Sequence, residues 1–148
     1  MLFLCFQLGQ DKYVVDARHV VEVLPLVTLR TTPHAPRGVA GAFIYRGTVV
    51  PVLDFGELAL GQPCPRRFST RILLLAYPMR DTRKTLGMIV ERATETKDLK
   101  AQDFMDNGLK TPGAPYLGPV LREEHRLIQS IAVQNLVPES IRDLLFGS

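Results

Sequence analysis

The sequence predicts a mainly β protein whose strands form small barrels or a sandwich. Short apolar runs follow one another at close spacing with turn residues between them, which is typical of such folds. No amphipathic helix of crossover length lies between two runs, so the pattern argues against parallel βαβ units. The two halves of the 148-residue chain also repeat weakly: residues 13–22 are similar to 86–91, and 48–58 to 127–136. Two related β units are therefore expected.

The N-terminal part of the chain begins with a hairpin. Leu2–Leu8 and Tyr13–Asp16 are apolar runs on either side of a polar turn, as in two antiparallel strands. Asp16 is a suitable N-cap, and three apolar residues recur at helical spacing before Pro25. This pattern predicts a short helix over 16–24.

Residues 38–58 form the most informative stretch. Two apolar runs meet at Tyr45-Arg46-Gly47, which predicts a tight hairpin turn with the Arg46 side chain displayed at its tip. The second run, 48–55, is apolar on both faces and is expected to be covered on both. Pro51 cannot donate a ladder hydrogen bond, so this strand should run along an edge or carry a bulge, open to a partner.

The remaining segments are placed by the same kinds of signal. Prolines and glycines mark loops, apolar runs mark strands, and a proline followed by an acidic residue marks the start of a helix. The expected elements, in chain order, are an extended run 26–29, a loop 31–36, a boundary loop 61–67, strands 71–77 and 86–90 joined by the turn 79–84, a polar segment 93–103, a loop 108–115, a strand 127–133 and a terminal helix 138–146.

Composition is that of an ordinary globular protein, with 46% apolar and 22% charged residues. No apolar run approaches the roughly 20 residues that span a bilayer, and residues 1–8 lack the basic leader and cleavage site of a signal peptide. The net charge of +3 is mild and the basic residues are scattered, which favours solvated surface over a nucleic-acid footprint. Cys5 and Cys64 are expected to be free thiols in a cytoplasmic protein.

Patterns for catalysis and metal binding are not found. His19, His34 and His125 stand far apart and belong to no metal-ligand motif. Residues 103–108 lack the ligand spacing of a calcium loop, and neither cysteine has a nearby histidine to activate it. The pair Glu123-Glu124 is typical of a solvated turn. We therefore expect no enzyme, no metal and no cofactor.

A recognition surface is the remaining candidate for function. Its best constituents are Arg46, the strand edge at Pro51, and the acids Glu22 and Asp54. Each also has a plain structural interpretation: Arg46 as a solvated hairpin tip, Glu22 as a charge on a helix face, and Asp54 as the start of a turn or the cap of the residues that follow.

Taken together, these motifs resemble the CheW family of chemosensory coupling proteins. The resemblance covers nearly the whole chain, and the Arg-Gly-x-x-x-Pro-x-x-Asp block is its most specific part. The matching residues are Phe6, Leu8, Gly9, Tyr13, Val20–Val23, Pro33, Pro36, Gly38–Gly41, Arg46–Asp54, Gly87–Val90 and Leu127-Ile128.

The resemblance implies one CheW-like domain over 1–148, built of two tandem SH3-like five-stranded β-barrels that exchange N-terminal strands. Their approximate bounds are 1–65 and 66–137, with a C-terminal helix over 138–148. It further implies a non-enzymatic adaptor that binds the cytoplasmic tip of a chemoreceptor and the regulatory domain of a CheA-type histidine kinase. Such a protein is cytoplasmic and recruited to the membrane through the receptor, without inserting into it. Self-association in arrays is left open.

The expected contact residues follow from this resemblance. Arg46 and Glu22 match a charged pair associated with receptor and kinase coupling, and opposite charges there would fix each other's geometry. An apolar groove would accept a partner element that Arg46 orients. The expected groove residues are Val20, Val23, Val39 and Val50.

Two positions depart from the family pattern. Ile44 stands where the family commonly has Asn, and Ala132 where it often has Asp. These departures suggest altered partner choice, as in an alternative pathway for surface sensing or a second-messenger output. The alternative function is a small β-barrel nucleic-acid-binding module, which a steep salt dependence of binding would support.

Overall fold

The computed structural model describes residues 1–79, 82–106 and 111–146, except for the side chains of Thr94 and Ser140. Over these residues the chain is mainly β, with ten strands in one connected sheet and two short α-helices. The elements are β1 (Leu2–Leu8), β2 (Asp11–Asp16), η1 (Ala17–His19), β3 (Val20–Pro25), β4 (Val39–Tyr45), β5 (Thr48–Asp54), α1 (Phe55–Leu60), β6 (Thr70–Pro78), β7 (Arg83–Asp98), η2 (Ala101–Asp103), β8 (Phe104–Met105), β9 (Leu117–Glu123), β10 (Arg126–Ile131), η3 (Val133–Asn135) and α2 (Glu139–Phe146).

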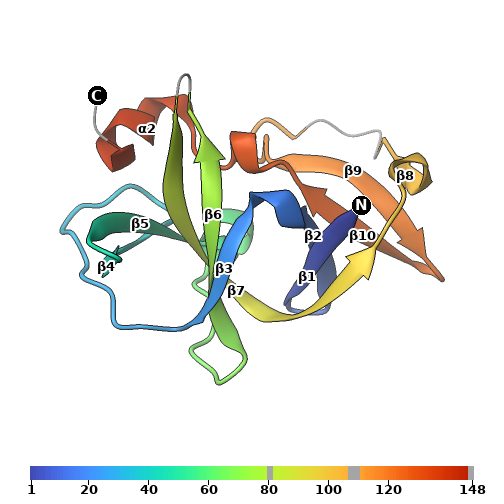
Figure 1. Ribbon diagram of the computed structural model, residues 1–148, viewed down its shortest axis with the longest axis horizontal. Coiled ribbons are helices and arrows are strands. Elements are labelled where there is room, and N and C mark those ends of the chain that lie inside the picture. The colour runs from blue at the N-terminus through green and yellow to red at the C-terminus, as the bar shows by residue number, and fades with distance from the viewer. Residues whose placement is uncertain (80–81, 107–110, 147–148) are drawn as a thin grey trace.

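The long strand β7 divides the sheet into two units that share it (Figure 1). Its N-terminal part pairs with β6 and β5, which continue to β3 and β4. Its C-terminal part pairs with β1, which continues to β2, β10, β9 and β8. The N-terminal hairpin therefore lies in the same unit as the C-terminal strands, consistent with the strand exchange expected from the family. The bounds 1–65 and 66–137 for the two units stay a prediction.

The internal repeat predicted from the sequence corresponds to a repeated strand arrangement. In one unit Val52–Asp54 of β5 pairs in parallel with Gly87–Ile89 of β7. In the other unit Ile128–Ser130 of β10 pairs in parallel with Lys12–Val14 of β2. One strand of each parallel pair also has an antiparallel neighbour: β4 lies beside β5, and β9 lies beside β10. A short helix follows the same strand in each case, α1 after β5 and η3 after β10.

The predicted helix over 16–24 is wrong for most of its length. Asp16 does cap a helical turn, with its carboxylate accepting a hydrogen bond from the backbone N–H of Arg18 at 2.9 Å, but the turn ends at His19. Residues 20–25 then form β3, which pairs with β6. Val20, Val21 and Val23 are β-branched, so the strand is the more favourable conformation once β6 offers a partner.

The chain also contains strands that the sequence analysis did not predict. β7 extends through the polar segment 93–98, because β1 pairs with it there. β9, which contains Gly118 and Pro119, forms an antiparallel pair with β10. The hairpins β1–β2, β4–β5 and β6–β7 are confirmed, as is the terminal helix α2. Part of the expected loop 108–115 lies outside the described residues.

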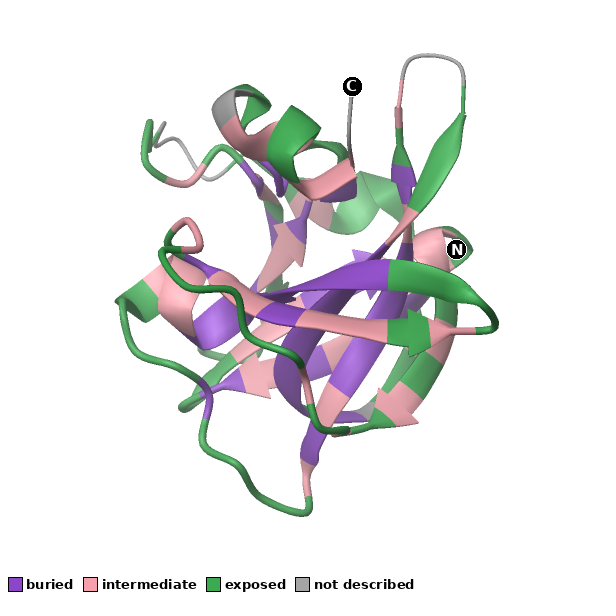
Figure 2. Ribbon diagram, turned by 90° about the vertical axis from the view of Figure 1, so that its left-hand side faces the viewer, coloured by how far each residue is buried: buried purple, intermediate pink, exposed green. Residues whose placement is uncertain are grey.

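The larger of two core clusters draws on strands of both units, and a smaller one, of Phe3, Val14, Leu121 and Ile128, lies within the unit of the N-terminal hairpin. Figure 2 shows buried residues concentrated in the central strands with exposed loops around them. The C-terminal helix covers the end of β6, because Phe146 stacks on Tyr77 with ring centroids 5.5 Å apart. The buried Tyr77 hydroxyl donates to the backbone oxygens of Gln134 and Val137 at 3.0 and 3.3 Å. Within the described part of the chain, no helix is long and apolar enough to cross a bilayer.

Candidate partner-binding surface

The β4–β5 hairpin presents Arg46 as the sequence predicted. Arg46 and Gly47 both have positive φ, 49° and 81°, which is the conformation of a two-residue type I′ turn. Tyr45 pairs with Thr48 on the two sides of this turn. The Arg46 side chain is exposed at the tip, and its guanidinium carbon lies 5.2 Å from the centre of the Tyr45 ring.

Tyr45 connects this cation to Glu22 on β3. The Tyr45 hydroxyl donates a hydrogen bond to the Glu22 carboxylate, and this bond raises the pKa of Tyr45, because the carboxylate stabilises the protonated phenol. The expected direct pair between Arg46 and Glu22 is not formed. Instead the tyrosine contacts both groups, so it holds the hairpin against β3. The role of Tyr45 was missed in the sequence analysis, although it directly precedes the turn.

The outer face of the hairpin displays two large apolar side chains. Ile44 and Val49 pair across the strands and are 72% and 67% exposed. Val49 was not singled out from the sequence, but its position follows from the turn, since a two-residue turn after Tyr45 places Val49 opposite Ile44. An exposed cation beside two exposed apolar side chains is a suitable composition for a recognition surface.

The valines predicted to line a groove differ in accessibility. Val23 on β3 is 37% exposed, as Val21 is at 54%, whereas Val20 and Val39 are half-buried and pack on the core. Val50 is fully buried. It lies in the core because β5 is buried from Val50 to Asp54, so it cannot contact a partner in this structure.

Asp54 and Pro51 are also buried, in contrast to the expected open edge. Asp54 caps α1: its carboxylate accepts hydrogen bonds from the backbone N–H groups of Glu57 at 3.1 Å and Cys64 at 3.0 Å. Arg66 lies 3.5 Å from the same carboxylate. Asp54 therefore has the structural role that the sequence analysis gave as its alternative. Pro51 does lie on an edge of the backbone, because β7 pairs with β5 only from Val52.

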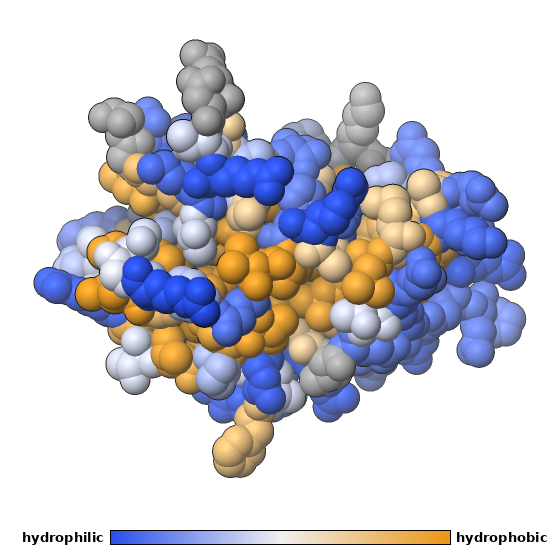
Figure 3. Space-filling view, viewed as in Figure 1, coloured by the Kyte–Doolittle hydropathy of each residue, from blue (hydrophilic) through white to orange (hydrophobic). Residues whose placement is uncertain are grey.

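A shallow apolar hollow lies in the unit that contains the N-terminal hairpin, at the start of β1 and the end of β10. Its volume is about 280 Å³, and it is lined by residues that include Met1, Phe3, His19, Phe104 and Ala132. Figure 3 shows hydrophobic residues gathered in a band across the middle of the face that β3 crosses in Figure 1. Ala132, one of the two departures noted in the sequence, therefore lines an apolar surface where an aspartate would place a charge.

In the described part of the chain, no group of His, Cys, Asp and Glu residues is placed to hold a metal ion. Both cysteines are free, Cys64 in the core and Cys5 half-buried. Burial raises the pKa of both thiols, that of Cys64 to about 12, which opposes a role as nucleophiles.

The chain is thus built of two linked β units and displays an exposed arginine beside exposed apolar side chains. Comparison with known proteins gives the family. Residues 2–140 match the CheW-like domain, and the chain belongs to this family. Proteins of the family are scaffolds that couple chemoreceptors and the CheA kinase in chemosensory signalling.

Two individual proteins are similar to this chain. The chemotaxis protein CheW of Treponema pallidum (strain Nichols) is 24% identical over 147 residues, which cover 88% of this chain and 84% of that protein. The crystal structure of the scaffolding protein TtCheW from Thermoanaerobacter tengcongensis superposes with a TM-score of 0.77 at 20% identity. That match covers 88% of this chain and 82% of the other, and it shows the shared fold.

Proposed function

We propose that this protein is an adaptor that couples a chemoreceptor to a CheA-type histidine kinase, without a reaction of its own. The membership in the CheW-like family supports the coupling role. The observation that places the partner contact at the β4–β5 hairpin is the exposed Arg46 at its tip. The guanidinium of Arg46 lies over the ring of Tyr45, and the Tyr45 hydroxyl is hydrogen-bonded to Glu22. In this arrangement the cation is displayed and its orientation is fixed before any partner binds, so less conformational entropy is lost on binding.

The proposed contact surface consists of Arg46, Ile44 and Val49 on the hairpin with Val21 and Val23 on β3. The exposed apolar side chains would be covered by the partner, and Arg46 would select an acidic or carbonyl-bearing group on it. Val20 and Val39 support these residues from the half-buried layer beneath. Asp54 and Val50 act only through the fold, since both are buried.

The second proposed contact is the apolar hollow at the start of β1 and the end of β10. Its lining is mostly apolar, which suits the apolar face of a receptor segment docked along it. The protein would then act in the cytoplasm, at the membrane only through its receptor. The two contacts lie on different parts of the molecule, so one adaptor can hold two partners at once.

Replacement of Arg46 tests the proposed coupling role. We expect Arg46→Ala and Arg46→Glu to keep the circular dichroism spectrum and melting temperature of the unchanged protein, but to weaken its binding to the kinase regulatory domain or receptor. The Glu variant should be the more severe, because it reverses the charge. Arg83→Ala, which removes another exposed arginine from the same unit, serves as the matched control. Unaltered coupling by a folded Arg46→Glu variant contradicts the proposed role of Arg46.

Partner choice is tested separately through the two departures. We propose that Ile44 and Ala132 direct the protein to the partners of an alternative chemosensory pathway, such as surface sensing or a second-messenger output. Ile44→Asn and Ala132→Asp should shift binding, in pull-downs against the chemoreceptors and CheA-type kinases of one genome, toward the partners of the swimming pathway. If the unchanged protein already prefers the swimming partners, the proposal of an alternative pathway is wrong.

A further inference from the structure

A polar cleft of about 490 Å³ opens at the β1–β2 turn, where the two units meet. Four separate segments contribute to it: the β1–β2 hairpin around its turn, the loop before β6, the middle of β7, and the start of β10. Its lining residues are Gln7, Leu8, Gly9, Gln10, Lys12, Pro65, Arg67, Glu91, Arg92 and Arg126. None of the residues proposed for coupling lines it.

Three arginines from different segments face this cleft. Arg67 comes from the loop before β6, Arg92 from β7 and Arg126 from β10. Among the described residues, none of these three guanidinium groups has an ion pair or a hydrogen bond. Lys12, the fourth cation, is bound to Glu123 at 3.0 Å. Like charges gathered in one concave site repel each other unless an anion lies between them.

The one carboxylate in the lining does not supply that anion. Glu91 is 5% exposed, and its two oxygens accept hydrogen bonds from the hydroxyls of Ser69 and Thr70. Its charge is thus held by neutral donors at the wall of the cleft, and the arginines keep their hydrogen-bonding capacity for a ligand.

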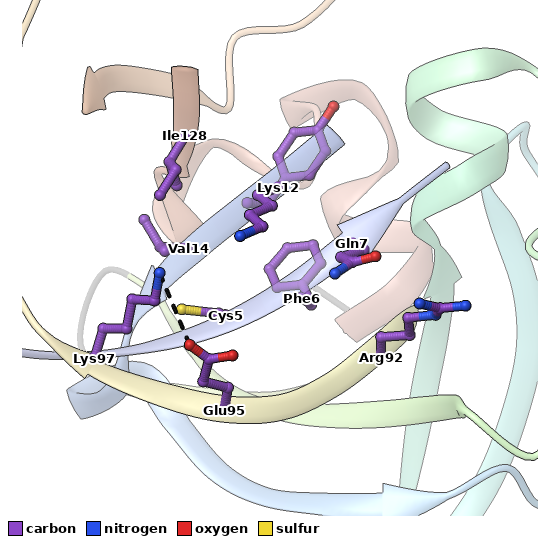
Figure 4. Close-up of a pocket in the computed structure, with 10 residues that line it drawn as sticks. Cys5, Phe6, Gln7, Lys12, Val14, Arg92, Glu95, Lys97 and Ile128 are labelled. Carbon is purple, nitrogen blue, oxygen red and sulfur yellow. Dashed lines mark ion pairs between the residues drawn. The ribbon is translucent and has the colours of Figure 1, made fainter. Parts of the chain in front are cut away.

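The backbone at Arg92 is held in an unusual conformation. Its φ is 51°, a region that glycine adopts without strain and that a side chain with a Cβ makes costly. The strain lies where the register between β1 and β7 shifts, after the pair Gln7 and Glu91. Figure 4 shows Arg92 beside Gln7, whereas Lys97 and Glu95 pair at the other end of the neighbouring pocket, 3.8 Å apart. The strained backbone therefore carries a guanidinium at the cleft, where a glycine would fit more easily.

We propose that this cleft binds a small ligand with two or more phosphate groups. Its volume is that of a small-molecule site, and the planar guanidinium presents paired donors that match phosphate oxygens. Three unpaired arginines from three segments can contact more than one phosphate. Among the described lining residues only Leu8 and Pro65 have apolar side chains, so the anionic groups carry the recognition, whether they belong to free pyrophosphate or to a nucleotide.

Calorimetric titration of the full chain with inorganic pyrophosphate tests this proposal, with sulfate at matched ionic strength as the reference anion. We expect saturable binding of pyrophosphate with sulfate at least about tenfold weaker. Arg92→Gln and Arg126→Gln should each weaken pyrophosphate binding by about tenfold or more, since each removes a charged hydrogen-bond donor. Arg122→Gln, on the neighbouring strand β9 and outside the cleft lining, should leave it unchanged.

Two further variants distinguish a site from a general basic surface. Arg92→Gly removes the guanidinium and relieves the backbone strain, so it should lose pyrophosphate affinity while its melting temperature rises. Asp11→Asn removes a carboxylate from the adjoining hollow, which shares Lys12 and Arg126 with the cleft, and should strengthen binding.

ADP binding as tightly as pyrophosphate supports recognition of the phosphates. The proposal is overturned if pyrophosphate binds no better than sulfate, if Arg122→Gln weakens binding as much as Arg92→Gln, or if only a single-stranded oligonucleotide binds.

Discussion

The Tyr45 hydroxyl donates a hydrogen bond to the Glu22 carboxylate, and this bond joins the two ends of one β unit. The strands of that unit pair in the order β3, β6, β7, β5 and β4, so Glu22 on β3 and Tyr45 on β4 belong to its first and last strands. Arg30 and Ala42 form a backbone bridge across the same gap, with N···O distances of 2.9 Å. The hairpin that displays Arg46 is therefore held in position by contacts in the middle of β4, through Ala42, and next to its tip, through Tyr45.

The Tyr45 and Glu22 pair predicts a change in a tyrosine titration. The hydrogen bond to Glu22 raises the pKa of Tyr45, so Glu22→Gln should lower it toward its ordinary value. NMR titration of protein labelled at tyrosine Cζ resolves the four tyrosines and measures this shift. The phenol is the protonated partner, so the bond is present below the unfolded pKa of about 10 and is lost as pH rises through the higher folded value. An unchanged Tyr45 titration in Glu22→Gln would mean that the bond is not formed in solution.

Replacement of Asp54 should destabilise the fold strongly. Asp54→Ala removes the N-cap of α1 and leaves the buried N–H of Cys64 without its acceptor, which together cost about 2–4 kcal/mol. Urea unfolding followed by circular dichroism measures this difference. Asp54→Asn, which keeps one acceptor oxygen, should cost less. Equal losses for both variants would show that the charge, and not the hydrogen bonds, holds this site.

Glu123 predicts a pH-dependent contribution to stability. Hydrogen bonds from Lys97 and Lys12 lower the pKa of Glu123, with the carboxylate 2.5 and 3.0 Å from the two ammonium groups. A carboxyl with a lowered folded pKa stabilises the protein above its unfolded pKa of about 4.3 and loses that contribution as pH falls through the folded value. Glu123→Gln should therefore be less stable than the unchanged protein at neutral pH and nearly equal to it in strong acid.

Urea unfolding at about pH 7 and about pH 3 checks this difference. Glu124→Gln is the matched control, because Glu124 is exposed in the β9–β10 turn. The size of the effect should be modest, since about a third of the Glu123 side chain is exposed and water screens the pairs. A difference that persists unchanged in acid would contradict the assignment to the Glu123 charge.

The buried thiol of Cys64 should not react in the folded protein. Cys64 is 3% exposed, and burial, with Asp54 nearby, raises its pKa to about 12. In a Cys5→Ser background, Ellman's reagent at about pH 8 should modify Cys64 only after urea unfolds the chain. Rapid modification without urea would show that the loop over Cys64 opens in the native state.

Local signals in the sequence were sufficient for three hairpins and the terminal helix. Around Arg46-Gly47 the turn chemistry alone sets which residues face each other, so Ile44 and Arg46 could be placed on the surface from the sequence. The repeat between residues 48–58 and 127–136 likewise anticipated the equivalent strands β5 and β10. The first conclusion depends on residues that are neighbours in the sequence, and the second on similarity between two parts of the chain. Both kinds of information can be read directly from the sequence.

Contacts distant in sequence could not be predicted in the same way. Residues 20–24 have a valine-rich pattern that suits a short helix or a strand, and β6 decided in favour of a strand by pairing with them. β9 contains Gly118 and Pro119, which favour a loop locally, but β10 pairs with it. Val50 and Asp54 were expected on a contact surface and are buried, because Val50 packs into the core and Asp54 caps α1 beside β7.

The sequence by itself determined the class of fold, the family and the displayed arginine, since these depend on periodicity, turn residues and a motif of fixed spacing. Only the tertiary structure decided what surrounds that arginine. Tyr45, and not Arg46, forms the contact with Glu22. Three arginines from segments far apart in the chain lie at one cleft. The first result arises from the closure of one unit, which brings β3 and β4 together, and the second from the meeting of the two units at β7; both bring together residues that no local pattern relates.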